Sequence, residues 1–599
     1  MRVPADDAVT CLRQAGAQRG ALVALVVHPD VGAALAFGDR SWSWPREDTA
    51  PQALAQRVED ELRPRWVWWS AAASLGRLRT SGLHLATCWD LAVAHRMLAG
   101  GQRDGPPDIW SLVHDLDPDS APRTGQLDLL GTAAEPSPAG RAGPESSAGP
   151  ESPVDSSGHL RAEWVDGGWG RTEARLRAWA LLVLRVQTLQ AGRLAERGRH
   201  PTVSGEPERA VHAESAAAML CVELERDGLP IDVPQAEQLI DEAVGPRPAD
   251  AHQAAALRRA RDLEVMRHAP QSDGVSVDLR NPAQVRGLLA GIGIDVPDTR
   301  SWRLEPWREQ HPLVEALLAW RKADRIGTTY GYTWLDRFVG PDARLRGPWQ
   351  ASDGAAGRMT AGAGLHNLPA ELRPAVAAPA GHVLVRADLG QIEPRVLAAI
   401  SGDPALTSAT LEDDLYLPVA QRLRVERPIA KVAVLAAMYG QTSGTAGEAL
   451  KGLDRAYPVA MQYLRRASDE GRAGRPVFTH GGRRVPMWGQ LEGLAPDAQS
   501  SLAAARGRFA RNAVVQGSAA ELFKAWAVTV RAQARALNAR VVLCLHDELL
   551  VECPTERADE AVALLHRTLD VVGAAWAPRS AVRFVADVRV VHRWSEAKE

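Results

Sequence analysis

Short apolar runs alternate with helix-like segments near the start of the chain. Residues 23–27, 31–37 and 66–69 are apolar runs of strand length, whereas residues 70–78 and 91–98 carry apolar side chains at helical spacing. Because predicted strands and helices alternate here, we expect a mixed α/β fold for this part of the chain.

The apolar pattern is then interrupted twice. Residues 132–159 are rich in Pro, Gly, Ser and Glu, and such a stretch buries too little apolar surface to offset the entropy of ordering it. We therefore expect a disordered surface insertion there. Helical spacing returns at residues 174–189, and after a second polar break at 200–209 a mostly helical region continues to about residue 338.

Two later apolar runs each end in acidic residues. Residues 382–387 run into Asp388, and residues 541–545 run into Asp547 and Glu548 at the predicted tip of a β-hairpin. Aspartates at the ends of two neighbouring strands can share a pair of Mg²⁺ ions, as in-line phosphoryl transfer requires. Each acid on its own is also explained as a solvated turn residue, so neither decides the function alone.

Between these acids, a predicted helix carries a slowly turning stripe of four side chains. Arg427, Lys431, Leu435 and Tyr439 are four residues apart and therefore share one helix face. Two cations followed by an apolar and an aromatic group can bind a triphosphate at one end and a base at the other. An amphipathic helix with exposed cations is the alternative. Lys431 favours the first interpretation, because lysine is rare among the 70 basic residues of this chain.

A further predicted helix at residues 502–527 carries Arg508, Asn512 and Gln516, again four residues apart. These donors and amides suit hydrogen bonds with minor-groove edges, where A·T and T·A pairs look alike. A polymerase needs such contacts because it must test the shape of a base pair without reading its sequence. A polar face exposed to solvent is the alternative.

Composition and charge restrict the class of protein. The chain has 599 residues and a formal net charge of −3, which excludes a uniformly basic DNA-coating protein but allows a local basic cleft. Five cysteines without a CxxC pair argue against a disulfide framework or a cysteine zinc site. No signal peptide and no apolar run of membrane-spanning length is recognised, so we expect a cytoplasmic protein.

Taken together and in this order, these segments resemble family A DNA polymerases, the DNA polymerase I type. The stretch from Asp388 to Arg395 resembles that family's motif A, residues 427–440 its motif B, and His546-Asp547-Glu548 its motif C. Shorter likenesses extend the resemblance from about residue 210 to about 595, at residues 219–232, 281–284, 311–313, 357–360, 367–369, 479–486 and 508–517.

The resemblance implies a multidomain protein of mixed α/β and α+β class. Residues 1–200 resemble, weakly, the RNase H-like 3′–5′ exonuclease domain that precedes the polymerase in this family. A right-hand polymerase is implied after it, with a thumb at 201–345, a palm at 346–402 and 496–599, and fingers at 403–495.

The implied reaction is attack of a primer 3′-hydroxyl on the α-phosphate of a dNTP, directed by a template and releasing pyrophosphate. Asp388, Asp547 and the backbone carbonyl of Leu389 would bind two Mg²⁺ ions, for which Mn²⁺ could substitute, and Glu548 would support them. Lys431 would be catalytic as well, because it could protonate the leaving pyrophosphate.

The resemblance also implies the residues that bind the substrates. The incoming nucleotide would contact Arg427, Lys431, Tyr439, Gln391, Glu393 and Leu435, and Glu393 would exclude a 2′-hydroxyl. Primer-template DNA would contact Arg358, Asn367, Thr479, Arg508, Asn512, Gln516 and His546. We expect a monomer whose partners are primer-template DNA and dNTPs, with no membrane association and a cytoplasmic location at the nucleoid.

Several residues depart from the family pattern. Leu389 and Gly390 replace the usual Tyr and Ser of motif A, Leu435 replaces an aromatic residue of motif B, and Tyr416 stands where a phosphate-binding His is common. Without a ring at position 435, we expect nucleotide affinity and sugar discrimination to differ from those of the family.

The N-terminal region lacks the acids of an active proofreading domain, which needs four of them to bind two metal ions. Its first strand ends in Val27 and His28 instead of an Asp-x-Glu, and Ser70 and Ser74 stand where an Asn and an Asp are expected. We therefore expect an inactive exonuclease-like domain that is retained as a scaffold.

Other functions remain open alternatives. A primer-template-binding protein whose catalysis has decayed should have lost some of the expected metal-binding or phosphate-binding residues, yet all are present. Glu393 disfavours an RNA polymerase, because an open sugar pocket needs a small group there. A polymerase that copies RNA is not excluded, and a two-metal nuclease would explain the aspartates but not the phosphate-binding helix.

Overall fold

The computed structural model describes residues 7–48, 50–78, 83–101, 103–120, 152–270, 277–440, 446–489, 494–545 and 547–598. His546 and most of the expected disordered insertion therefore lie outside the described residues. The chain forms two compact units. Unit 1 comprises Met1–Leu224, Trp349–Thr360 and Ala387–Arg589, and unit 2 comprises Glu225–Pro348, Ala361–Arg386 and Val590–Glu599.

Unit 1 begins with a five-stranded mixed sheet in the order β3-β2-β1-β4-β5. β2 is antiparallel to β1 and β3, whereas β4 is parallel to β1 and β5. The strands are β1 (Leu22–His28), β2 (Gly32–Phe37), β3 (Arg40–Pro45), β4 (Arg65–Trp68) and β5 (Thr87–Asp90). The predicted strands at 23–27, 31–37 and 66–69 are confirmed to within a residue.

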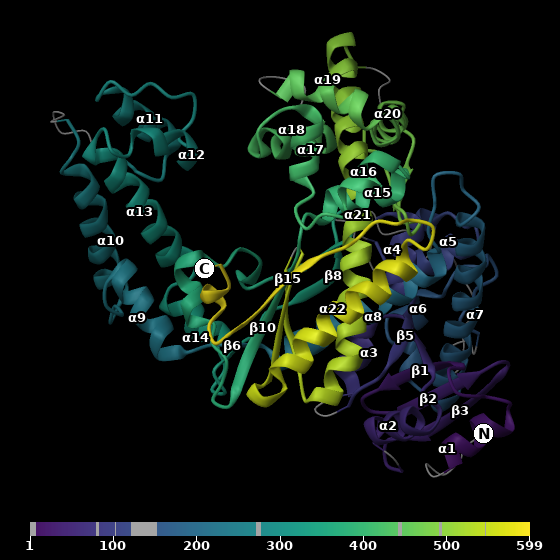
Figure 1. Ribbon diagram of the computed structural model, residues 1–599. Coiled ribbons are helices and arrows are strands. Elements are labelled where there is room, and N and C mark those ends of the chain that lie inside the picture. The colour runs from purple at the N-terminus through teal and green to yellow at the C-terminus, as the bar shows by residue number, and fades with distance from the viewer. Residues whose placement is uncertain are drawn as a thin grey trace, which may run out of the picture. The chain divides into compact units, whose positions relative to one another are not determined.

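Both faces of this sheet are covered, because the side chains of β1 alternate between two buried clusters. Val23, Leu25 and Val27 belong to one cluster, and Ala24 and Val26 to the other. The first cluster includes α1 (Ala8–Gln14), α2 (Pro51–Leu62) and α3 (Ala71–Leu78), and the second includes α4 (Leu91–Ala99), α5 (Pro106–Val113), α6 (Ala162–Val165) and α7 (Glu173–Arg197) (Figure 1).

The next helix, α8 (Pro207–Asp227), shifts the boundary that the sequence suggested near residue 200. Its residues Ala216 and Met219 are buried in the first cluster of the N-terminal sheet. For this reason unit 1 continues to Leu224 before the chain enters unit 2.

Part of the expected disordered insertion is ordered. Val154 forms a β-bridge with Leu160, and the Asp155 carboxylate accepts hydrogen bonds from the amides of Ser157 and His159. Residues 152–159 thus form a closed turn, and the expectation of disorder was wrong for them.

A second sheet has the strand order β13-β14-β10-β15. β13 (Arg540–Leu545) and β14 (Glu548–Pro554) form the predicted hairpin, in which Leu545 pairs with Glu548. The chain passes between the units within β10 (His382–Leu389) and β15 (Ala586–Val591). In unit 1 the long helix α21 (Pro496–Ala534) packs against α22 (Ala558–Trp576) and β13.

The remaining helices of unit 1 gather along α21 (Figure 1). They are α15 (Ile392–Ser401), α16 (Pro404–Ala409), α17 (Tyr416–Leu423), α18 (Arg427–Tyr439), α19 (Ala446–Ala456) and α20 (Pro458–Arg472). Two short ribbons, β8 (Trp349–Asp353) with β9 (Arg358–Ala361) and β11 (Val477–Phe478) with β12 (Arg484–Val485), complete this part of the chain. The helix predicted at 427–440 is confirmed, and the one predicted at 502–527 is longer at both ends.

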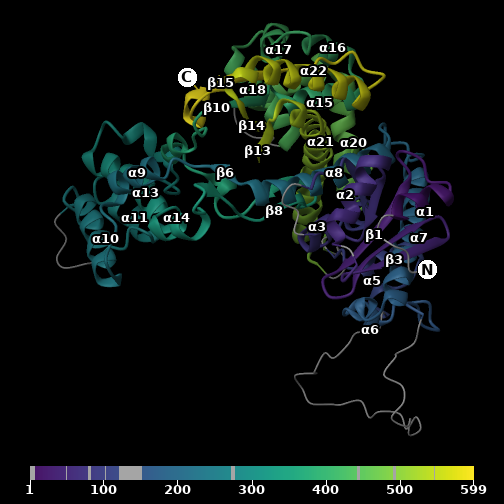
Figure 2. The same ribbon diagram turned by 90° about the horizontal axis from the view of Figure 1, so that it is seen from below.

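Unit 2 is mostly helical, as expected for the region up to residue 338 (Figure 2). Its elements include β6 (Leu229–Pro230), α9 (Val233–Val244), α10 (Ala251–Met266), α11 (Pro282–Ala290), α12 (Ser301–Leu304), α13 (Pro312–Thr329), α14 (Tyr332–Phe338) and β7 (Arg344–Leu345). Leu289, Leu313 and Leu317 are completely buried in its core. Among the described residues, no helix of either unit combines the length and apolar character needed to cross a bilayer.

Candidate nucleotide and metal site

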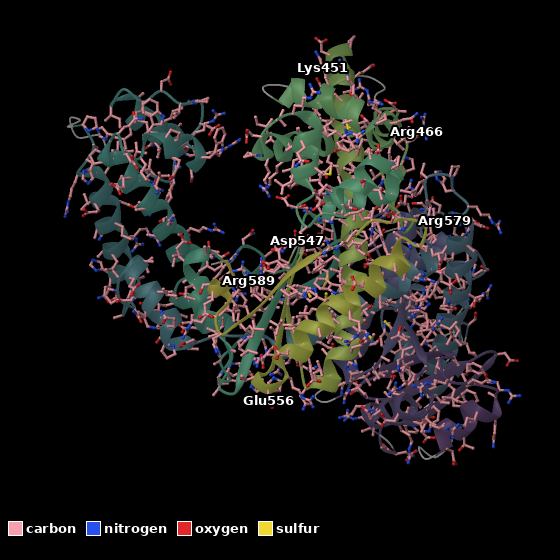
Figure 3. The ribbon with its side chains drawn as sticks, in the orientation of Figure 1. Lys451, Arg466, Asp547, Glu556, Arg579 and Arg589 are labelled. Atoms are coloured by element: carbon pink, nitrogen blue, oxygen red, sulfur yellow. The ribbon has the colours of Figure 1, made fainter. Side chains whose placement is uncertain are left out.

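Asp388 and Asp547, distant in sequence, lie next to each other in unit 1. Asp388 is the penultimate residue of β10, and Asp547 occupies the turn between β13 and β14, where Figure 3 labels it. The amide of Leu389 donates a hydrogen bond to the carbonyl of Asp547 across 2.9 Å. Burial, followed by the charge of Asp388, raises the pKa of Asp547 from 3.8 to about 6. The carboxylate of Asp388 is therefore close enough to disfavour the ionisation of Asp547.

These residues fit a divalent metal ion of the Mg²⁺ type. Two carboxylates that repel each other in a partly buried place are stabilised by a cation, and carboxylate and carbonyl oxygens are the ligands that Mg²⁺ prefers. Within the described part of the chain, no group of three or more His, Cys, Asp or Glu is arranged to hold a metal ion. Protein carboxylates alone would thus leave coordination positions for carbonyl, water or phosphate oxygens.

A cavity of about 360 Å³ opens beside Asp547. Most of the predicted nucleotide-binding residues meet there, from α18 and from the start of α15, and further lining residues come from α17, α21 and β9. The lining residues are Arg358, Gln391, Ile392, Glu393, Pro394, Tyr416, Arg427, Lys431, Leu435, Gln516, Ala519, Ala520 and Asp547. The cavity therefore brings cations, an apolar wall and carboxylates into one space.

Helix α18 presents its predicted stripe to this cavity. Arg427 forms an ion pair with Asp414 at 2.5 Å, and its guanidinium lies 5.7 Å from the centre of the Tyr416 ring. Lys431 is exposed and has no hydrogen bond or ion pair to a described residue, and Leu435 adds an apolar surface one turn further along. Lys431 is thus available to an anionic ligand, whereas Arg427 is already directed by Asp414.

Gln391 connects the end of β10 to the start of α17. Its backbone is left-handed, with φ 55°, and its side-chain amide donates to Asp414 at 2.9 Å while its carbonyl accepts from the Leu415 amide at 2.8 Å. Asp414 therefore holds both Gln391 and Arg427. Burial alone would raise the pKa of Asp414, but the contact with Arg427, then the Tyr416 amide, and to a smaller extent Gln391, outweigh burial and keep that pKa below its usual value.

Both carboxylate oxygens of Glu393, which lines the cavity, are engaged by neighbouring side chains. Arg358 contacts one oxygen at 3.0 Å, and the Tyr439 hydroxyl donates to the other at 3.2 Å. Burial, and then the charge of Glu393, raises the pKa of Tyr439, so this hydroxyl stays protonated as a donor. The carboxylate is consequently fixed in the cavity wall.

The stripe on α21 continues from the cavity along the helix. Gln516 lines the cavity, Asn512 is half-buried and Arg508 is exposed. Arg508 packs against Gly440, whose φ of 69° ends α18 and where a Cβ atom would lie only 2.9 Å from the Arg508 side chain. The predicted minor-groove residues are therefore contiguous with the nucleotide pocket.

Comparison with known proteins agrees with this geometry. The sequence profile described as DNA polymerase family A matches residues 294–596, which is half of the chain. The chain belongs to DNA polymerase family A. It is 30% identical over 331 residues to the thermostable DNA polymerase I of Thermus filiformis, a match that covers 50% of this chain and 38% of that protein. It is 29% identical over 357 residues to DNA polymerase I of Deinococcus radiodurans, covering 52% of this chain and 36% of the relative.

The match spans well under half the length of these curated relatives. A solved structure described as the POL domain of Pol1 from M. smegmatis, in complex with DNA primer-template and dNTP, aligns over 100% of both chains with a TM-score of 0.68 and 21% identity. That level of identity supports a shared fold. The chain thus has the mixed α/β multidomain fold of a family A polymerase domain.

One predicted DNA contact of this family A chain is buried in the protein interior. Thr479 is completely buried, and its hydroxyl donates to Glu521 and accepts from the Arg483 amide. Its predicted contact with DNA was therefore wrong, because the side chain is committed to the protein interior. Asn367 belongs to unit 2, where its backbone carbonyl accepts from the Tyr330 hydroxyl at 2.7 Å. His546 lies outside the described residues.

Two functional residues of this family A chain were missed from the sequence. Asp414 directs Arg427, and Arg395 uses its whole guanidinium to hold the backbone around Asp414. Arg395 donates to the carbonyls of Gly390, Thr410, Glu412, Asp413 and Arg583. Their local signal in the sequence is weak: Arg395 ends the motif A stretch, and Asp414 lies two residues before Tyr416. Both roles depend on contacts between segments that are distant in sequence.

In the N-terminal sheet, the end of β1 at His28 is surrounded by aromatic side chains from later segments. His28 packs edge-on against Trp169 at 5.4 Å, Trp169 stacks with Trp179, and Gly170 is required because a Cβ there would lie 2.1 Å from His28. At the end of β5, Asp90 is buried and accepts from the amides of two neighbouring segments. No group of metal-binding acids is present in the described part of this sheet.

Proposed function

We propose that the protein is a template-directed DNA polymerase that adds dNTPs to a primer 3′-hydroxyl and releases pyrophosphate. The observation that carries this proposal is the single cavity lined by Arg427, Lys431, Glu393, Gln516 and Asp547. The side chains that line this cavity suit the phosphates, the sugar and the base of a nucleotide. Membership of DNA polymerase family A supports the choice of reaction.

The phosphate end of the pocket is formed by α18. Lys431 has no partner among the described residues, so it can meet a phosphate without breaking an existing ion pair. Arg427 binds the terminal phosphates and exchanges part of its contact with Asp414 for them. Lys431 then donates a proton to the leaving pyrophosphate, which stabilises the charge that develops there.

Asp388, Asp547 and the backbone carbonyl of Leu389 would hold two divalent cations, Mg²⁺ or in its place Mn²⁺. Bound there, such ions would lower the pKa of an attacking hydroxyl and would neutralise the negative charge that develops during phosphoryl transfer. Glu548, which is buried beside Asp547, adds to the negative charge of this end of the pocket.

The sugar end of the pocket is formed by Glu393 and its partners. Because Arg358 and Tyr439 fix the carboxylate, it cannot move aside for a 2′-hydroxyl, and ribonucleotides are rejected. Leu435 and the buried ring of Tyr416 form the apolar wall in place of the usual aromatic residue and histidine. Tyr439 would stack near the templating base.

We propose primer-template DNA as the partner of the Arg508, Asn512 and Gln516 stripe, with Arg358 beside it. In this proposal residues 346–402 and 496–599 form a palm, residues 403–495 the fingers and unit 2 most of a thumb. The protein acts as a monomer in the cytoplasm at the nucleoid.

We also propose that the N-terminal sheet is an exonuclease-type, RNase H-like scaffold that no longer proofreads. The aromatic packing around His28 and the use of Asp90 as a cap of α4 support this proposal. Position 28 is not acidic, and the carboxylate of Asp90 is buried and already hydrogen-bonded, so neither can bind a metal ion beside a DNA end.

One primer-extension experiment tests these proposals. Purified protein receives primed DNA or primed RNA template with Mg²⁺ and either dNTPs, rNTPs or no nucleotide. We expect extension on DNA with dNTPs only. Binding without any extension would instead indicate a decayed primer-template-binding protein, and equal extension on RNA would indicate a reverse transcriptase. In the arm without nucleotide, a mismatched 3′ end should stay intact, and steady trimming would contradict the loss of proofreading.

A further inference from the structure

A buried ionic cluster lies behind the nucleotide pocket in unit 1. Glu214 of α8 forms an ion pair with Lys524 of α21 at 2.5 Å and accepts a hydrogen bond from Arg483 at 2.7 Å, and all three side chains are at most 3% exposed. Isolated charges of this kind are costly to bury, so each partner depends on the other two. The cluster contributes no atom to the cavity lining.

The cluster holds the backbone that carries Arg358. The Lys524 ammonium donates to the carbonyl of Gly357 at 2.6 Å, which belongs to the peptide bond between Gly357 and Arg358. Gly357 has a φ of 66°, and a Cβ there would lie 2.4 Å from the Arg483 guanidinium. Both cations that pair with Glu214 therefore pack directly against the residue before Arg358.

The position of Glu214 is set from the other side by the N-terminal sheet. The next residue, Ser215, accepts a hydrogen bond from the amide of Asp90 at 3.0 Å, and its carbonyl accepts from the Cys88 thiol. Ala216 is buried in the core of that sheet. A continuous series of contacts thus leads from β5 through Glu214 and Lys524 to Arg358, which holds Glu393 in the pocket wall.

We propose that Glu214 is a positioning residue for the polymerase site, and that the N-terminal sheet is retained because it holds Glu214 in place. This inference rests on the proposed function. Without the Glu214 carboxylate, the Lys524 ammonium is no longer directed to the Gly357 carbonyl, and Arg358 loses its fixed position against Glu393. The effect of Glu214 on nucleotide selection therefore runs through Arg358.

The chain provides a matched control for this proposal. A second buried ion pair, between Glu223 and Arg531 at 2.6 Å, joins the same two helices, α8 and α21. Arg531 also donates to the carbonyls of Leu85 and Ala86, which lie next to β5 rather than next to the pocket. Loss of this pair weakens the same helix contact without touching the Gly357 peptide.

The test is a double-mutant cycle between Glu214→Gln and Arg358→Ala, read as kcat/KM for dNTP incorporation below the unfolding temperature of every variant. We expect Glu214→Gln to lower kcat/KM about tenfold in the wild-type background and less than about twofold in the Arg358→Ala background. Glu223→Gln should change kcat/KM by less than about twofold in both backgrounds, although it lowers the melting temperature.

Equal losses in the two backgrounds, or no loss from Glu214→Gln, would overturn the proposal. The same cycle is read from the dissociation constant of a fluorescent dNTP, which needs no chemistry. If the wild-type protein binds dNTP but does not extend a primer, the proposed function is refuted. The coupling between Glu214 and Arg358 can still be measured from dNTP binding in that case. If Glu214→Gln does not fold, the double variant Glu214→Gln/Lys524→Met takes its place, because it removes both buried charges and fills the space with an apolar side chain. This variant is then compared in the wild-type and Arg358→Ala backgrounds in the same way.

Discussion

The backbone amide of Leu389 donates a hydrogen bond to the backbone carbonyl of Asp547 across 2.9 Å. This bond holds the end of β10 against the turn of the β13–β14 hairpin, so Asp388 at the strand end and Asp547 in the turn lie side by side. Their mutual repulsion contributes to the raised pKa of Asp547.

Replacement of either aspartate should therefore abolish catalysis while DNA binding persists. We expect Asp388→Ala and Asp547→Ala each to lower kcat for primer extension by roughly a thousandfold or more, because each removes a cation ligand. Fluorescence anisotropy should show primer-template affinity within about threefold of wild type. Asp413→Ala is the control, since that side chain is 85% exposed and forms a surface ion pair with Arg583. Extension by Asp547→Ala within a few-fold of wild type would refute the metal assignment.

Much of this site was predictable because its signals are local. A four-residue spacing places side chains on one helix face independently of tertiary contacts. Arg427, Lys431, Leu435 and Tyr439 have this spacing, and the first three line the cavity. The acids of the strand ends were equally visible, since an apolar run that stops at a carboxylate is a local pattern.

The two cations of α18 should have separable kinetic effects. Lys431→Ala should slow the chemical step about 100-fold or more with little change in dNTP affinity, because a proton donor is lost. Arg427→Ala should mainly raise KM for dNTP, about tenfold, because a phosphate contact is lost. Single-turnover extension at several dNTP concentrations distinguishes the two. Lys451→Ala is the control, because Lys451 lies in α19 at the far end of these helices from Asp547 (Figure 3). A pure affinity loss in Lys431→Ala would reassign that residue.

Sugar discrimination should depend on Glu393. We expect Glu393→Ala to raise kcat/KM for rNTPs relative to dNTPs by roughly 10- to 100-fold, since the fixed carboxylate no longer meets the 2′-hydroxyl. Competitive incorporation of matched dNTP and rNTP pairs measures this ratio directly. Glu426→Ala, an exposed residue that precedes α18 without capping it, should leave the ratio unchanged. An unchanged ratio in Glu393→Ala would show that another group excludes ribose.

Other parts of the site depend on tertiary packing and left no local trace. The Asp414 carboxylate reaches Arg427 from a separate segment, and the carbonyls that Arg395 binds extend to Arg583. Thr479 illustrates the opposite error. A motif likeness shows that a residue type suits a position, but it does not show whether the side chain faces a substrate or, as here, the buried carboxylate of Glu521.

Stability at low pH should depend on Glu223. Burial alone would raise its pKa, but the ion pair with Arg531 and the hydrogen bond with His84 outweigh burial and lower the pKa from 4.5 to about 2. The folded state therefore binds fewer protons than the unfolded state between these values, so the contribution of Glu223 is complete above about pH 4.5 and is lost as the pH falls towards 2.

The difference in unfolding free energy between wild type and Glu223→Gln should accordingly shrink by roughly 2 kcal/mol between pH 7 and pH 3, and by roughly 3 kcal/mol once the pH reaches 2. Urea unfolding of both proteins at pH 7, 5, 4 and 3, followed by tryptophan fluorescence, measures the difference. Glu237→Gln serves as the control, because Glu237 is 47% exposed in its pair with Arg247 and should change stability by less than about 1 kcal/mol at any pH. A wild-type advantage over Glu223→Gln that stays constant from pH 7 to pH 3 would mean that Glu223 acts through packing and not through its charge.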